Sequence, residues 1–92
     1  MKIENIAHFI FENAKKRNFA CYASVNLLFS MEKSYYIECQ RRNLKYSFSI
    51  TNKNLIIYTN SNSENDYLYE YTIPLYELSK GKLQSIVIAF FN

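Results

Sequence analysis

The stretch that decides the fold is FACYASVNLLF, residues 19–29, in which every odd-numbered residue is apolar. Tyr22, Ser24 and Asn26 lie between these apolar positions. Successive side chains of a β-strand point to opposite faces of the sheet, so this alternation predicts a long strand with one buried face. The segment before this stretch has a different period, and most of the segments after it have the same one.

The preceding segment, Lys2 to Arg17, has the three-and-four spacing of an amphipathic helix. Its predicted buried face comprises Ile3, Ile6, Ala7, Ile10, Phe11 and Ala14. Basic residues in the last turn complement the helix dipole. Asn18 is expected to end the helix in the left-handed conformation that asparagine tolerates.

Four further segments are predicted to be strands because they are short, alternating and bounded by polar residues. They span residues 35–40, 44–51, 55–60 and 67–73, with turns at 30–34, 41–43 and 52–54 and a polar loop at 60–66. Short connections favour antiparallel neighbours. The sequence therefore predicts the α+β class, with an N-terminal amphipathic helix packed on a twisted antiparallel sheet of five or six strands. Residues 1–92 are expected to form one domain.

The residue pattern decides least clearly between helix and strand in the segment after Pro74. Pro74 interrupts the strand and can begin a short helix that ends at Gly81. Residues 83–91 fit a helical stripe, but Ile86, Val87 and Ile88 are β-branched. We therefore predict a sixth strand there.

Composition argues against common catalytic schemes. The chain has one histidine, one glycine and two cysteines, against nine tyrosines and seven phenylalanines. One glycine cannot build a P-loop or a dinucleotide fingerprint, and no Cys/His cluster suggests zinc. We expect no enzyme activity, no cofactor and no metal. Cys21 and Cys39 are interpreted as free thiols, with a disulfide between adjacent strands as the alternative.

One histidine-containing group is an alternative to this view. Glu4, His8 and Glu12 are spaced four apart on the helix, and such groups can bind a metal or transfer protons. The favoured interpretation is a solvated helix face with side-chain pairs four residues apart.

The tyrosines form the first candidate site. A sheet covered by a helix on one side leaves its other face to solvent, and tyrosine is enriched at protein interfaces. The predicted protein-binding residues are Tyr22, Tyr36, Tyr58, Tyr67, Tyr69 and Tyr71. The alternative is that these tyrosines only stabilise the sheet through cross-strand pairs.

The basic residues form the second candidate site. If the end of the helix and the turn at 41–43 converge, they could bind phosphates in a nucleic acid. This nucleic-acid site would comprise Lys15, Lys16, Arg17, Arg41, Arg42 and Lys45.

The expected function is therefore that of a small non-enzymatic protein-binding module, with nucleic-acid binding as the alternative. The partner would be another protein, and a homodimer through the sheet is a further alternative. We expect a cytoplasmic location and no membrane, because the longest apolar run, Ile86 to Phe91, is too short to span one.

The composition also bears on the source of the chain. Asn, Lys, Ile, Tyr and Phe supply 45 of 92 residues, which indicates an AT-rich genome such as that of a low-GC bacterium or its phage. In size, single-domain build and lack of catalytic motifs, the chain resembles phage-encoded inhibitors of host defence such as anti-CRISPR proteins. This resemblance is one of profile and assigns no role to any residue.

Overall fold

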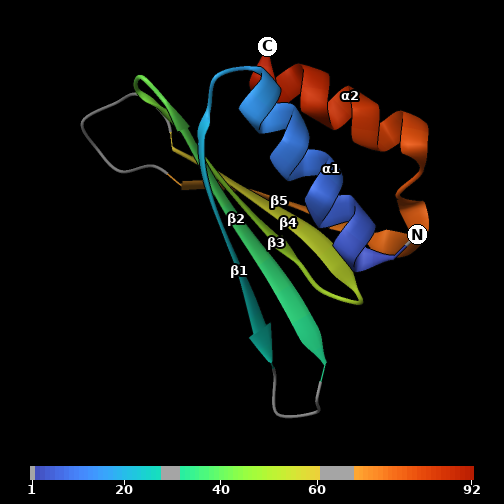
Figure 1. Ribbon diagram of the computed structural model, residues 1–92. Coiled ribbons are helices and arrows are strands. Elements are labelled where there is room, and N and C mark those ends of the chain that lie inside the picture. The colour runs from blue at the N-terminus through green and yellow to red at the C-terminus, as the bar shows by residue number, and fades with distance from the viewer. Residues whose placement is uncertain (1, 28–31, 61–67) are drawn as a thin grey trace.

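The fold is an antiparallel sheet with two helices on one face (Figure 1). The computed structural model describes residues 2–27, 32–60 and 68–92. Its elements are helix α1 (Ile3–Lys16), strands β1 (Ala20–Leu27), β2 (Lys33–Arg41), β3 (Leu44–Ile50), β4 (Asn54–Asn60) and β5 (Leu68–Pro74), the 3-10 turn η1 (Leu75–Glu77), and helix α2 (Lys80–Phe91). The strand order in the sheet follows the chain, and every pair is antiparallel. The predicted α+β class with an N-terminal helix on the sheet is confirmed.

Helix α1 buries one stripe and ends as its sequence predicts. Its fully covered residues are Ile6, Ala7, Ile10 and Ala14. Asn18 has a φ of 65°, in the left-handed region, and the amide of Phe19 then returns to donate to the Ala14 carbonyl at 3.0 Å. The left-handed residue therefore turns the chain from the helix directly into the sheet.

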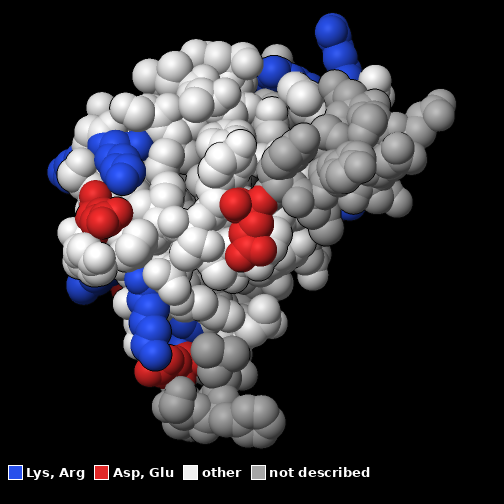
Figure 2. Space-filling view, turned by 180° about the vertical axis from the view of Figure 1, so that it is seen from behind, with Lys and Arg blue, Asp and Glu red and all other residues white. Residues whose placement is uncertain are grey.

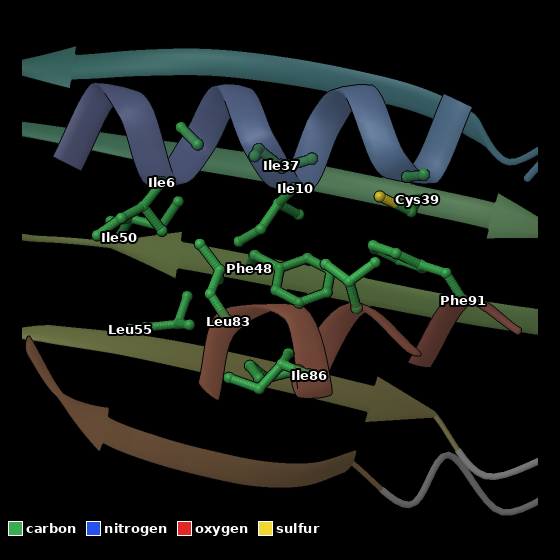
Figure 3. Packing of buried hydrophobic residues seen from close by; sticks show 14 of the residues in the cluster. Ile6, Ile10, Ile37, Cys39, Phe48, Ile50, Leu55, Leu83, Ile86 and Phe91 are labelled. Atoms are coloured by element: carbon green, nitrogen blue, oxygen red, sulfur yellow. The ribbon is translucent and has the colours of Figure 1, made fainter. Parts of the chain in front are cut away.

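The sheet has one apolar face and one polar face, because its register keeps the two sets of side chains apart. In β2 and β3, Ile37 lies opposite Phe48 and Cys39 lies opposite Tyr46. These side chains pack beneath α1 and α2, where Figure 3 shows the core between the helices and the sheet. The strand segments predicted at 35–40, 44–51 and 55–60 are confirmed with small differences at their ends.

Strand β1 departs from its predicted burial. Its odd-numbered residues share the helix-bearing face, as Cys21 opposite Cys39 shows. Farther along, however, Ala23 is exposed and Val25 is 55% exposed. The reason is position: β1 lies at the edge of the sheet, and its far half runs past the helix layer (Figure 1).

The predicted sixth strand is wrong, since residues 83–91 belong to helix α2. Its buried stripe comprises Leu83, Ile86, Val87 and Phe91. Helix α1 packs against β1, β2 and β3, which leaves the apolar face of the remaining strands to be covered. Tertiary packing therefore overrides the β-preference of the branched residues. Gly81 lies inside the first turn of α2, so it does not end a helix.

An aromatic cluster joins α2 to the sheet. The Phe91 ring centroid lies 5.1 Å from that of Phe19 and 5.6 Å from that of Phe48. Phe90 meets Tyr46 edge-on at 5.3 Å. Such tilted arrangements are favourable for aromatic pairs beyond the area they bury.

Parts of the predicted connections lie outside the described residues. These are residues 28–31, which include Phe29 and the start of the turn at 30–34, and residues 61–67, which include most of the polar loop and Tyr67. Within the described ranges, no helix is long and apolar enough to cross a membrane.

Candidate binding surface

The helix-free face of the sheet is built by the same alternation that builds the core. Tyr22 of β1 and Tyr58 of β4 alternate with residues that point toward the helices. Helices α1 and α2 both lie on the opposite face (Figure 1). No element among residues 2–27, 32–60 and 68–92 covers this helix-free face.

Two of the predicted tyrosines fall in one row across all the strands. The register pairs each member of the row with the next, and the row reads Tyr22, Glu38, Ser47, Tyr58 and Glu70. We call these five residues the tyrosine row. Tyr22 is 63% exposed and Tyr58 is partly exposed. Such stiff, amphipathic side chains offer contact area at little entropic cost.

The third tyrosine of this face is fixed next to the tyrosine row. The Tyr36 hydroxyl donates to Ser47 Oγ at 3.1 Å. Tyr36 lies in the neighbouring row, between Ser24 on β1 and Ser49 on β3. The helix-free face therefore presents three aromatic rings set among small hydroxyl side chains.

The charges on this face are mixed and lean acidic. Lys45 Nζ lies 2.9 Å from Glu38 Oε1, and the hydrogen bond and charge of Glu38 raise the pKa of Lys45. Glu70 is exposed at the end of the tyrosine row. Two carboxylates and one ammonium make a face with no attraction for a polyanion.

The remaining predicted tyrosines do not join Tyr22 and Tyr58. Tyr71 pairs with Ile57 and therefore lies on the helix-bearing face, where its ring meets Phe90 at 6.0 Å. Tyr69 is described only through its backbone pairing with Thr59. Tyr67 lies outside the described residues.

One exposed tyrosine was missed by the sequence reasoning. Tyr76 is 87% exposed and lies in η1, between β5 and α2, rather than in a strand of the sheet. Its only sequence signal is its place just after Pro74, where a chain commonly turns at the surface.

The basic residues do converge at one corner of the molecule. Arg41 Nη1 donates to the Arg17 carbonyl at 2.7 Å, which brings the end of α1 against the hairpin between β2 and β3. A shallow hollow beside this contact is lined by Asn18, Arg41, Arg42, Asn43 and Leu44.

Two of the five basic residues at this corner, Arg17 and Arg41, are engaged within the protein. The Arg41 guanidinium lies 4.4 Å from the centroid of the Phe19 ring, in a cation–π contact. Arg17 Nε donates to Asn92 Oδ1 at 3.0 Å. The carbonyls that end α1 also face this corner, and the helix dipole makes them negative.

The wider charge distribution agrees with this local picture. In Figure 2, coloured charged side chains lie in small groups of both signs, without a continuous basic surface on that side. Lys45, the sixth predicted nucleic-acid residue, lies on the helix-free face in its ion pair. The exposed basic residues at the corner are Lys15, Lys16 and Arg42.

On the histidine-containing face of α1, Glu4 and His8 are exposed. Glu4 Oε2 accepts a hydrogen bond from the Tyr35 hydroxyl at 3.2 Å. Partial burial and this bond raise the pKa of Tyr35. Within the described part of the chain, no three His, Cys, Asp or Glu residues lie close enough to hold a metal ion.

The two cysteines are free thiols on neighbouring strands, as expected from the sequence. Cys21 Sγ lies 3.9 Å from Cys39 Sγ. Burial raises the pKa of both thiols, most strongly that of the fully covered Cys39. Thiols held protonated in this way are poor nucleophiles.

Comparisons with known proteins add no further assignment. No protein-family model matches this chain. No curated protein and no solved structure matches it either.

Proposed function

We propose that this protein is a non-enzymatic protein-binding module that contacts its partner with the helix-free face of the sheet. The observation that carries the proposal is the tyrosine row, which lies on a face that no described element covers. Interfaces favour such aromatic residues surrounded by small polar side chains. A module of this kind would act by occupying a surface of its partner, as an inhibitor of a host protein does.

The charges favour a protein over a nucleic acid as the partner. Lys45 is paired with Glu38, while Arg17 and Arg41 make internal contacts. Nucleic-acid binding depends on basic groups that can reach phosphates. The basic corner supplies three exposed side chains of that kind, and the tyrosine row supplies none.

The test is co-purification with three matched forms of a tagged protein. The wild type, a Tyr22→Ser/Tyr58→Ser double variant and a Tyr76→Ser variant would each be expressed in a low-GC bacterial host. Captured proteins would be identified by mass spectrometry before and after nuclease treatment. Tyr76 is the control because it is more exposed than Tyr22 but lies in η1, outside the strands of the sheet.

The expected result is one stoichiometric protein that survives nuclease, binds the wild type and the Tyr76 variant, and is lost from the double variant. Equal capture by all three forms would contradict the assignment of the face. Capture of nucleic acid alone, released as salt rises, would instead favour the corner of Lys15, Lys16 and Arg42.

A further inference from the structure

Strand β1 is an unprotected edge of the sheet. Its register with β2 runs without interruption from Ala20 to Leu27, so no bulge bends it away from a partner. Its other edge has no neighbour among the described strands. An edge strand of this kind presents a row of unpaired backbone donors and acceptors that another strand can satisfy.

The composition of β1 is that of an interior strand. It spans eight residues, ACYASVNL, without a charge or a proline. Among the strands that the structure describes, the only other one without a charged residue is β4, which is paired on both sides. The opposite edge, β5, carries Glu70 and ends at Pro74, and such residues discourage further pairing.

Both faces of β1 leave contact area exposed at the edge. On the helix side, Ala23 is exposed and Val25 is 55% exposed. On the other side, Tyr22 is 63% exposed. A strand added beside β1 would cover an apolar strip on one face and the flank of a tyrosine ring on the other.

We propose that β1 pairs with β1 of a second copy of this chain, antiparallel and about a two-fold axis normal to the sheet. The proposal is independent of the function proposed for the tyrosine row. An uncharged strand suits a copy of itself, because a charge near the axis would face its own image. A two-fold axis of this orientation keeps both helix layers on the same side and places one residue of β1 opposite its own copy. Centring the pair on Ala23 or Ser24, the middle of the strand, pairs the most residues of Ala20–Leu27. The exposed strip of Ala23 and Val25 then meets the same strip of the second copy.

The helix layer leaves room for this pairing. Helix α1 packs against β1, β2 and β3, so it lies over the region of β2. The two β2 strands would be three strand spacings apart, about 14 Å. Packed helices need an axial separation of about 8–10 Å. The two copies of α1 can therefore lie side by side over a continuous sheet of ten strands, twice the five of one copy.

The test compares two lysine substitutions at positions of equal exposure. Val25→Lys places a charge on the proposed edge, and Ile88→Lys places one on α2; both side chains are 55% exposed. Sedimentation equilibrium would measure the dimer dissociation constant of the wild type and of both variants. We expect wild type and Ile88→Lys to dimerise alike, and Val25→Lys to raise the constant at least about tenfold.

Three results would overturn the proposal. They are a wild type that sediments as a monomer up to about millimolar concentration, equal effects of the two lysines, and a stronger effect of Ile88→Lys. Asn26→Lys, exposed on the other face of β1, is the second variant if Val25→Lys does not fold. Hydrogen exchange adds a local readout, since the outward β1 amides should be protected at high concentration in the wild type and in Ile88→Lys, but not in Val25→Lys.

Discussion

Arg41 illustrates how a basic residue can be a structural residue. Its guanidinium covers the Phe19 ring and donates to the Arg17 carbonyl, so one side chain ties the β2–β3 hairpin to the end of α1. The neighbouring Arg42 is exposed and has a φ of 56°. Two adjacent arginines thus have different roles, which their sequence positions alone do not separate.

Arg41→Ala should lower the free energy of unfolding by about 1–2 kcal/mol, through loss of the cation–π contact and the hydrogen bond. Arg42→Ala should change it by less than about 0.5 kcal/mol. Urea unfolding of both variants measures the difference. Equal losses would mean that the Arg41 contacts add nothing to stability.

The raised pKa of the buried Cys39 thiol predicts that the protein loses stability at alkaline pH. Burial, followed by the neighbouring Cys21, raises the pKa of this thiol above the ordinary 9.0. The unfolded chain therefore loses this proton first, so unfolding becomes easier as pH rises above about 9. Urea unfolding at about pH 8 and about pH 10 should show this fall in wild type.

The control for this prediction is Cys39→Ala. The variant starts from a lower stability because it leaves a small cavity, but its stability should fall less between the two pH values. A fall as steep as that of wild type would assign the effect to other groups, with Cys21 the first to consider and Tyr46 the next, since burial also raises the pKa of both.

The tyrosines show what could be predicted at single positions. Tyr22, Tyr36 and Tyr58 lie on the helix-free face as the alternation predicted. Tyr71 does not. Each of the two alternating sets of side chains in its strand contains both apolar and polar groups, so the sequence does not say which set faces the core. The Tyr71 ring packs on Phe90, a residue that was expected in a strand.

At the scale of elements, the start of α2 is marked by a short local sequence signal, a helix N-cap. Ser79 Oγ accepts a hydrogen bond from the Lys82 amide at 3.1 Å, the usual geometry of a helix N-cap. The signal for the start of the helix is therefore contained in residues 79–83. The β-branched residues that favour a strand, Ile86 to Ile88, come one turn later. The start of the helix was predictable from Ser79, but the choice of helix over strand required knowing that an uncovered apolar face lay nearby.

Ser79→Ala should lower the free energy of unfolding by about 1 kcal/mol, because it removes the N-cap. Ser85 is the matched control, since its hydroxyl donates to the Gly81 carbonyl inside the same helix. Ser85→Ala should be neutral or slightly stabilising, as alanine is the better helix former. Thermal unfolding of the pair is decisive, and a Ser79→Ala variant as stable as wild type would contradict the capping role.

For the whole molecule, stability depends on the aromatic cluster that joins α2 to the sheet. Phe91 is 1% exposed and contacts Phe19, Tyr46 and Phe48. Domains of this size have a total stability of about 5–15 kcal/mol. One buried ring can therefore account for a large fraction of it.

Phe91→Ala should cost about 3–5 kcal/mol, through lost burial and the cavity left behind. Ile88→Ala on the exposed side of the same helix should cost less than about 1 kcal/mol. Urea denaturation followed by circular dichroism measures both values. A Phe91 variant that loses no more than the Ile88 variant would show that α2 is dispensable to the core.

The fold was predictable to the extent that it depends on local pattern. The helix at 3–16, the strand alternation and the antiparallel order follow from periods and short turns. Two features depend on assembly: the second helix of the covering layer, and the exposure of Val25 where β1 runs past α1. Residues 83–91 carry a helical stripe, but the choice of helix over strand and the exposure of Val25 each depend on how far one element reaches over another.

The sequential strand order has a consequence for folding kinetics. Each strand pairs with its neighbour in the chain. Only short loops therefore have to close to form the sheet, and each hairpin can form within microseconds. The covering helices flank the sheet in sequence, and α1 and α2 contact each other on one face of it. We expect the sheet to form early with its apolar face bare, and the docking of the two helices to set the folding rate.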